Sequence, residues 1–493
     1  MHSQIQQPVR RVTIQPTGIS FRPDSARVLI RPFVPADPAR IINIIGRALS
    51  LSEAETEEQL ASALADFSGR HVDIKKFWLR RFDQVKQHVF SSRPLVEARR
   101  LYIGALFSGE YALESAALFN PSIVPHPDQG GLAEGELRFI LSLRATGEGH
   151  ISSIEFRTGV IRSDHSMQVE NISRFVTSPE LDLNPTYRKT VFLDKLIEMG
   201  FENDWSHVVM QPLGATFTLS ELEKSIQRAV NGLRPLSRDV QRTMECVRWL
   251  AESNYELHFS PSVALSERII FPVSQNESNG IEDARFVRFV DDDGAVTYFA
   301  TYTAYNGRVI LPQLLETTDF LNFRALTLNG RAVQNKGMAF FPRRIDGRYA
   351  MISRQDDESL FLMFSDNPHF WSDPKVLRRP GPPWEFVKIG NCGSPIETKA
   401  GWLVLTHGVG AMRKYCIGAM LLDLDDPSKI ISHLDEPLLK PEGNEREGYV
   451  PNVVYTCGGL VHRGRLILPY GLSDSASTIV TIELDELLAA LAP

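Results

Sequence analysis

Two carboxylates and an arginine lie close together between Asn279 and Arg285, where Glu282 and Asp283 precede Ala284 and Arg285. Apolar runs typical of strands flank this cluster on both sides. Carboxylates are costly to hold near an apolar core unless they are paired, so the cluster favours a functional site around Asp283. The alternative is a turn that carries only a surface ion pair.

Basic residues recur next to apolar runs that predict strands. Arg144, Arg354 and His407 each follow an apolar run that predicts the second strand of a hairpin, and Lys336 precedes another such run. One basic residue after apolar ones is commonly only a strand leaving the core. Three at matching places instead favour an oxyanion pocket, suited to phosphate or a carboxylate.

The hairpins themselves form a repeat. Apolar runs surround Gly294, Gly347, Gly401 and Gly464, and a weaker copy surrounds Gly135. Asp-Gly between apolar runs is a strong hairpin signal. A second pattern, N-E-x-x-G before an apolar strand, occurs at residues 276–280 and 444–448. A period of roughly 50 residues with several strands in each copy predicts a mainly β fold, a five-bladed β-propeller.

Strand ends of a propeller converge around its central channel, so the functional residues should come from equivalent places in different blades. Asn120 and Asp474 occupy such places, as do Arg144, Asp283 and Arg285. We therefore add Asn120 and Asp474 to the candidate site.

Two segments interrupt the β pattern. Residues 1–115 are predicted to be largely helical and residues 185–255 to form a helical insertion, which leaves 116–184 and 256–493 for the propeller. Capping boxes begin a helix in each segment, Ser52 with Glu55 and Thr218 with Glu221. The insertion carries no catalytic signature, so we expect it to serve packing or the assembly of a homo-oligomer.

Composition excludes several classes of function. The chain has 493 residues with a net charge of −7, which argues against nucleic-acid binding and against docking to an anionic membrane. The four cysteines are not paired as C-x-x-C, and the amino terminus has no apolar signal region. Nucleotide, serine-hydrolase and zinc-protease motifs are absent from the sequence. We expect a cytoplasmic protein without a metal or an organic cofactor.

From Phe119 to about Leu488, the chain resembles glycoside hydrolase family 130, the β-mannoside phosphorylases and related β-mannosidases. The resemblance is carried by Gly280-Ile-Glu-Asp-Ala-Arg285, by the segment from Lys336 to Arg354, and by Gly401-Trp-Leu-Val-Leu-Thr-His-Gly408. It implies a five-bladed propeller with Asp283 as general acid and Lys336, Arg354, His407 and Tyr415 as phosphate ligands. The family usually has proline where this chain has Ala284.

This assignment leaves three hypotheses. Inverting phosphorolysis of β-1,2- or β-1,4-linked mannosides to α-mannose 1-phosphate needs one acid and a cationic pocket for the attacking phosphate, its co-substrate. A β-mannosidase on the same scaffold would need a second carboxylate as base, for which Glu445 is the candidate. The third hypothesis is a non-catalytic propeller that binds a sugar or a protein. The expected sugar ligands are Asn120, Arg144, Arg285, Glu445 and Asp474.

Overall fold

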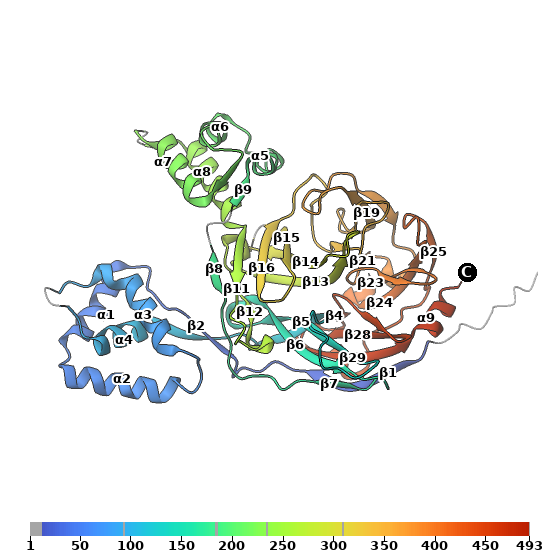
Figure 1. Ribbon diagram of the computed structural model, residues 1–493, viewed down its shortest axis with the longest axis horizontal. Coiled ribbons are helices and arrows are strands. Elements are labelled where there is room, and N and C mark those ends of the chain that lie inside the picture. The colour runs from blue at the N-terminus through green and yellow to red at the C-terminus, as the bar shows by residue number, and fades with distance from the viewer. Residues whose placement is uncertain (1–11, 92–93, 183–185, 233–234, 308–309, 493) are drawn as a thin grey trace, which may run out of the picture.

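The computed structural model describes residues 12–91, 94–182, 186–232, 235–307 and 310–492. Antiparallel sheets dominate its body, and two groups of helices project from that body (Figure 1). The prediction of a mainly β fold is therefore confirmed. Among the described residues, five sheets have four to six strands each, and two further sheets are two-stranded.

The five larger sheets draw on most of the chain. One contains β12 (Ile269–Ile270), β6 (Ser152–Ile161), β5 (Leu137–Thr146) and β4 (Ala117–Pro125), with β7 (Met167–Val169) beside β6. The six-stranded sheet contains β13 (Gly280–Val290), β14 (Val296–Tyr305), β15 (Ile310–Thr317), β16 (Asn322–Thr327), β11 (Tyr255–His258) and β8 (Glu180–Asp182). The four-stranded sheet contains β17 (Ala339–Phe340), β18 (Tyr349–Ser353), β19 (Leu360–Ser365) and β20 (Lys375–Arg378).

The other two larger sheets come from the carboxyl-terminal part. One contains β21 (Lys388–Asn391), β23 (Gly401–Val409), β24 (Tyr415–Leu422) and β25 (Ile430–His433), with β22 (Ile396–Thr398) beside β23. The last contains β1 (Ile14–Phe21), β29 (Ala476–Glu483), β28 (Arg465–Leu472) and β26 (Val454–Tyr455), with β27 (Leu460–His462) beside β28. Strand β1 thus joins the two ends of the described chain in one sheet, a pairing that the sequence did not predict.

Each helical region is connected to the body through a pair of antiparallel strands. Strands β2 (Val28–Pro32) and β3 (Ser108–Ala112) pair with each other and carry α1 (Pro38–Ser50), α2 (Glu53–Phe67), α3 (Ile74–Val85) and α4 (Glu97–Leu106). Strands β8 and β11 pair at the edge of the six-stranded sheet and carry the insertion. Its elements are β9 (Thr186–Arg188), α5 (Lys189–Glu198), α6 (Asp204–Met210), β10 (Thr216–Thr218), α7 (Leu219–Val230) and α8 (Arg238–Glu252), with β9 paired to β10.

Local sequence signals account for many of these elements. Both predicted capping boxes form, at the start of α2 and of α7. The hairpin turns predicted around Gly294, Gly347, Gly401 and Gly464 connect β13 to β14, β17 to β18, β22 to β23 and β27 to β28. At Gly347 and Gly464 the backbone φ is positive, which glycine adopts without a steric penalty.

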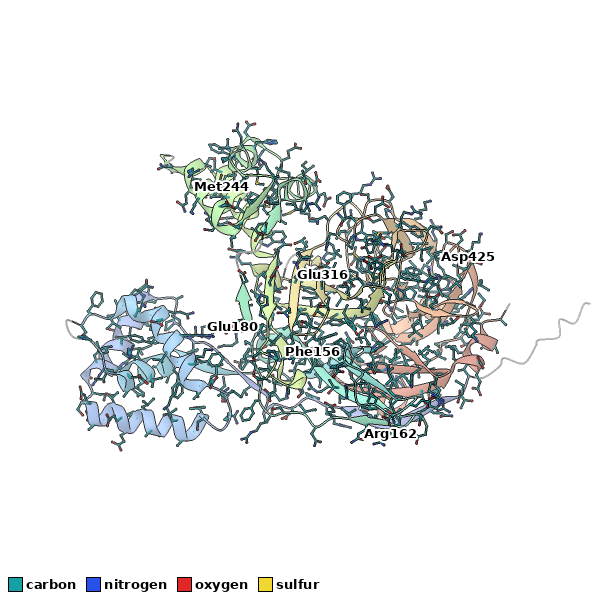
Figure 2. All side chains as sticks on the ribbon, viewed as in Figure 1. Phe156, Arg162, Glu180, Met244, Glu316 and Asp425 are labelled. Atoms are coloured by element: carbon teal, nitrogen blue, oxygen red, sulfur yellow. The ribbon has the colours of Figure 1, made fainter. Side chains whose placement is uncertain are left out.

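Separate apolar clusters fill the body and the insertion. Phe156 is fully buried between the first sheet and the six-stranded sheet, where its ring contacts those of Phe286 and Phe320 (Figure 2). Met244 lies in the insertion's own core. Finally, no helix among the described residues is both long enough and apolar enough to cross a bilayer, and α9 (Leu484–Ala490) closes the chain against the last sheet.

Candidate active site

Asp283 lies in a β-bulge near the start of β13, where the pairing with β14 shifts between Glu282 and Arg285. Its φ is 55°, in the left-handed region that aspartate and asparagine tolerate better than most residues. Asn120 occupies a matching bulge in β4 with a φ of 50°. Asn120 Nδ2 donates to Asp283 Oδ1 at 2.6 Å, so the two bulges aim their side chains at each other.

Cations surround the carboxylates of β13. Arg144, which pairs with Phe119 at the end of β5, donates to Glu282 Oε1 at 2.8 Å and to Asp283 Oδ1 at 3.3 Å. Lys336 Nζ lies 3.0 Å from Glu282 Oε2. The sequence cluster therefore forms a partly buried ion-pair network rather than the surface pair that was its alternative.

This network sets the charge of Asp283. Burial alone would raise the pKa of its carboxyl, but the positive charges of Arg144, Arg285 and Lys336, together with the Asn120 hydrogen bond, hold that pKa below its usual value. Asp283 is therefore ionised at neutral pH when no ligand is present.

Asp474 follows β28 in a tight turn and has the opposite tendency. Burial and the negative charge of Asp283 raise the pKa of Asp474 to about 6, against the attraction of Arg144 and Arg413. Two aspartates thus share one site with their pKa values pushed apart, an arrangement common where proton transfer occurs.

The predicted basic residues Arg354 and His407 contact each other directly. Arg354 follows β18 and His407 lies on β23, and Arg354 Nη1 lies 3.0 Å from His407 Nε2. His407 Nδ1 lies 3.2 Å from the Asn391 carbonyl oxygen. From these partners we assign the proton to Nδ1, so that Nε2 accepts from Arg354. Only glycine fits at Gly390, because a Cβ there would lie 2.2 Å from the His407 ring.

His407 is held neutral in this arrangement. Burial lowers the pKa of its imidazole well below the usual value, and the positive charges of Arg354 and Arg285 lower it further. Arg354 Nη2 also pairs with Asp357 at 3.2 Å, and Lys388 shares that carboxylate at 2.8 Å. Without a ligand, His407 thus orients Arg354 rather than adding a second full charge.

Arg285 and Tyr455 connect the two groups of residues. Arg285 Nη1 donates to the Asp283 carbonyl oxygen at 3.1 Å, and Nη2 donates to the Tyr455 hydroxyl at 2.6 Å. The Tyr455 ring meets the His407 ring edge-on at 5.0 Å, and Tyr415 stacks on His407 with ring centroids 5.8 Å apart. The structure thus gathers nine of the ten predicted residues: Asn120, Arg144, Asp283, Arg285, Lys336, Arg354, His407, Tyr415 and Asp474.

The carboxylate of Glu445 has different partners, although its backbone carbonyl accepts a hydrogen bond from Ser473, the neighbour of Asp474. Glu445 Oε1 accepts from the Tyr470 hydroxyl at 2.8 Å, and its Oε2 accepts from the Glu442 amide at 3.3 Å. The other copy of the N-E-x-x-G repeat does the same: Glu277 accepts from the hydroxyls of Tyr255 and Tyr302, both at 2.8 Å. In both copies, the glutamate of the repeat therefore hydrogen-bonds the loop before a strand to tyrosines of the sheet that contains this strand.

Three contributing residues were not among the predicted site residues. Tyr455 ends a short apolar strand and resembles the aromatic residues that fill a core, so nothing in its sequence context distinguished it. Asp357 pairs with Arg354 within the turn that follows β18, and Lys388 at the start of β21 pairs with the same carboxylate. Only their proximity in the fold identifies them.

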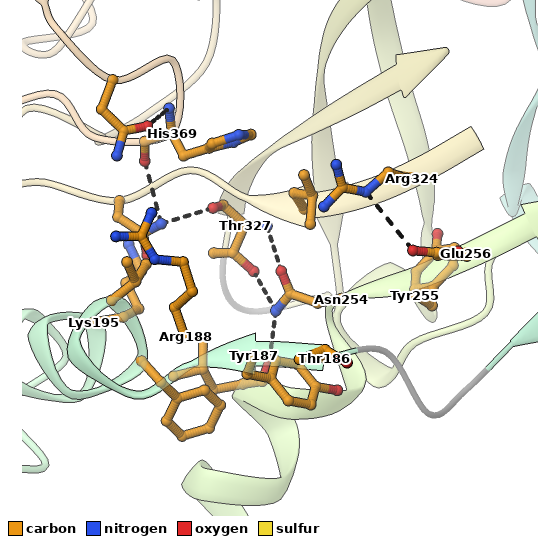
Figure 3. A pocket seen from close by; sticks show the side chains of 16 residues that line it. Thr186, Tyr187, Arg188, Lys195, Asn254, Tyr255, Glu256, Arg324, Thr327 and His369 are labelled. Atoms are coloured by element: carbon orange, nitrogen blue, oxygen red, sulfur yellow. Dashed lines mark hydrogen bonds and ion pairs between the residues drawn. The ribbon is translucent and has the colours of Figure 1, made fainter. Parts of the chain in front are cut away.

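A cavity of about 280 Å³ lies elsewhere, between the insertion and the edge of the six-stranded sheet (Figure 3). Its polar groups mostly bind one another: Asn254 donates to the Leu250 carbonyl at 2.9 Å and accepts from the Thr327 amide at 3.0 Å. None of the predicted site residues lines it. We interpret this cavity as part of the packing contact between the insertion and the six-stranded sheet. No group of three or more His, Cys, Asp or Glu side chains suited to a metal ion occurs among the described residues.

Comparison with known proteins places the chain in a family. The model of glycoside hydrolase family 130, described as β-1,4-mannooligosaccharide phosphorylase, matches residues 260–492. A 1,2-β-oligomannan phosphorylase of Thermoanaerobacter is 35% identical over 228 residues, which cover 45% of this chain and 75% of that protein. A β-1,2-mannobiose phosphorylase of Listeria innocua is 30% identical over 253 residues, covering 49% and 68%.

Among solved structures, a complex of the Listeria innocua β-1,2-mannobiose phosphorylase with β-1,2-mannobiose aligns with a TM-score of 0.44 and 21% identity, over 76% of this chain and 92% of that one. The sequence matches establish the relationship. This chain belongs to glycoside hydrolase family 130.

Proposed function

We propose that the protein catalyses the inverting phosphorolysis of β-1,2- or β-1,4-linked mannosides to α-mannose 1-phosphate. The observation that carries the proposal is that Arg285 and Tyr455 connect the backbone of Asp283, and so the strand that bears its carboxylate, to the Arg354–His407 pair. One acid beside a cluster of cations is what phosphate attack on a glycoside requires. The names of the three relatives that match in sequence, which are phosphorylases of β-mannosides, support the same substrate class.

The chemistry assigns a task to each group. Phosphate, held by Lys336 and by Arg354, which His407 orients, attacks the anomeric carbon of the terminal mannosyl unit from the face opposite the glycosidic oxygen. The bond from that carbon to the glycosidic oxygen breaks, and the oxygen receives the proton of Asp283. Inorganic phosphate is its own nucleophile, so no catalytic base is needed.

The electrostatics couple phosphate binding to the acid. Asp283 must be protonated to act, yet Arg285 and Lys336 help to hold its pKa down in the unliganded site. A bound phosphate dianion would offset those positive charges and so raise the pKa of Asp283 toward the protonated form. In this scheme the acid acquires its proton when its co-substrate is present.

The fold that we propose for this chemistry is a five-bladed propeller. Its support is that each of the five larger sheets, or a loop adjoining it, contributes to the site: Asn120, Asp283, Arg354, His407 and Tyr455 come from five different sheets or their adjoining loops. The pairing of β1 with β29 would close such a ring between the first and last strands of the described residues.

The deciding experiment incubates the protein with β-1,2- and β-1,4-mannobiose, with and without inorganic phosphate, and measures mannose 1-phosphate and free mannose. We expect phosphate-dependent formation of mannose 1-phosphate. Release of two mannose units at the same rate without phosphate would contradict the proposal and favour the mannosidase. No turnover in either condition would favour the non-catalytic propeller.

A further inference from the structure

A groove of about 1120 Å³ runs between the helical insertion and the six-stranded sheet. Helices α5 and α8 of the insertion supply one wall, including Glu198, Arg242, Glu245 and Trp249. The other wall consists of loops at one end of the sheet: Gln275 and Ser278 before β13, and the segment before Lys336 that includes Gln334. Sites for drug-sized molecules span about 300–1,000 Å³, so this groove has room for an extended ligand.

The loops that line the groove also lead to the active site. Gln334 precedes Lys336 by two residues, at most about 7 Å of chain, and Lys336 contacts Glu282. Ser278 precedes Asp283 by five residues, about 17 Å of extended strand. The groove therefore begins within a few sugar units of the carboxylate network.

The insertion is held firmly over these loops. Lys195 of α5 is buried and donates to the Leu328 carbonyl at 2.9 Å. Ser253, directly after α8, is hydrogen-bonded to Asn276 in the loop that precedes β13. Buried Glu277 of the same loop accepts from Tyr255, the residue with which the chain re-enters the sheet. The groove's two walls thus have a fixed spacing, as a preformed binding site requires.

The side chains of the groove suit a neutral, polar ligand. Lys195 pairs with Glu198 at 3.2 Å and Arg331 with Asp373, which leaves Arg242 and Glu245 with opposite charges. Within the described residues, the side chains of Glu245 and Gln275 are exposed and have no hydrogen bond or ion pair with protein. Trp249 is half-buried, and Phe201 lies under the Arg242 guanidinium at 5.5 Å. Aromatic faces beside carboxylate, amide and guanidinium groups can pack against sugar rings and bind their hydroxyls.

We propose that this groove binds the sugar units of an oligosaccharide beyond the mannosyl unit that is transferred, so that the insertion selects longer substrates. The inference rests on the proposed function, because release of mannose 1-phosphate places the terminal unit beside Asp283 and directs the rest of the chain outward. The insertion's helices carry no acid–base cluster, so the sequence predicted packing or assembly for them, and the family resemblance, whose minimal core lacks the insertion, added a different chain-length preference as an alternative.

The test compares Glu245→Ala and Gln275→Ala with a matched control, Glu202→Ala, which removes an exposed insertion carboxylate that does not line the groove. The measurement is the ratio of kcat/KM for β-mannotriose to that for β-mannobiose, with phosphate saturating. We expect each groove variant to lower this ratio about 3- to 10-fold, the effect of one lost hydrogen bond, and the control to leave it unchanged.

Calorimetry of β-mannotriose binding to Asp283→Asn, alone and combined with Glu245→Ala, provides a readout that does not depend on turnover, and the double variant should bind more weakly. An active enzyme whose ratio is the same in all variants would overturn the groove proposal alone. A wild-type protein that forms no mannose 1-phosphate from either sugar would reject the proposed function, and the groove proposal with it.

Discussion

The two halves of the candidate site balance charge differently. In the half around β13, three carboxylates, Glu282, Asp283 and Asp474, face three cations, Arg144, Arg285 and Lys336. In the half around β23, Arg354 and Lys388 share the single carboxylate of Asp357, and His407 is neutral. The charges of the half around β13 balance one another without a ligand, whereas the half around β23 has an excess of positive charge that an anion would neutralise.

This difference explains how one site can handle a proton and a phosphate together. In the half around β13, neighbouring charges set the protonation state of the acids. In the half around β23, the excess positive charge attracts the phosphate co-substrate. Arg285 borders both halves, because its charge acts on Asp283 and on His407, so a ligand that binds in one half changes the electrostatics of the other.

Removing the acid should have the largest effect. Asp283→Asn keeps the shape and the Asn120 contact but loses the proton, and we expect kcat for unactivated β-mannobiose to fall by about 10²–10⁴. Steady-state kinetics with phosphate saturating checks this. Activity within twofold of wild type would show that the acid lies elsewhere.

The same variant tests the charge balance. Because the folded-state pKa of Asp283 is lowered, its ionised form stabilises the fold above the unfolded pKa, and this contribution is lost as the pH falls through the folded-state value. Thermal unfolding of Asp283→Asn should therefore occur below wild type at pH 7, with a difference that shrinks toward pH 3.

Removing a cation from the second half should act on phosphate. Arg354→Ala is expected to raise KM for phosphate about 10- to 100-fold, the worth of a charge-assisted hydrogen bond, with little change in KM for the sugar. The control is Arg343→Ala, which removes an exposed pair with Glu397, a hydrogen bond to the Arg344 carbonyl and a contact with the Trp402 ring, but no predicted phosphate ligand. Equal rises in both Michaelis constants for Arg354→Ala would argue against a phosphate pocket.

Replacing Asp474 should change stability and activity in opposite directions. The pKa of Asp474 is about 6 in the folded protein, against 3.8 in the unfolded chain, so the fold disfavours its ionised form. Ionisation of Asp474 therefore lowers the free energy of unfolding increasingly as the pH rises from about 3.8 through 6. Asp474→Asn should gain about 3 kcal/mol in unfolding free energy at pH 8 and less than about 1 kcal/mol at pH 4, while its kcat/KM for the sugar falls. Denaturant titrations at the two pH values measure the gain. A variant that is less stable than wild type at pH 8 would refute this electrostatic account.

The smallest effect is expected at Glu445, whose carboxylate bonds residues of neither half. Glu445→Gln retains a hydrogen-bond acceptor for Tyr470, so phosphorolysis should fall less than about fivefold, whereas loss of a catalytic base would cost about 10²-fold or more. Assays with and without phosphate distinguish the two cases, and a large loss confined to the phosphate-free reaction would revive the mannosidase hypothesis.

Local sequence determined a good part of what the structure contains. The hairpin turns, the capping boxes of α2 and α7 and the cluster from Glu282 to Arg285 depend on residues within a few positions of one another. Turn conformations and caps are decided by short-range sterics and hydrogen bonds, which a sequence displays directly. The N-E-x-x-G repeat was also visible, although its task of bonding tyrosine hydroxyls was not.

Only the tertiary structure decided which groups meet and how they ionise. Asn120 contacts Asp283 across 163 residues, β1 pairs with β29, and Tyr455 connects Arg285 to His407. The neutral state of His407 and the raised pKa of Asp474 come from burial and from charges on other sheets. Such properties depend on desolvation and distance among segments far apart in the chain, so residue type and spacing alone could not reveal them.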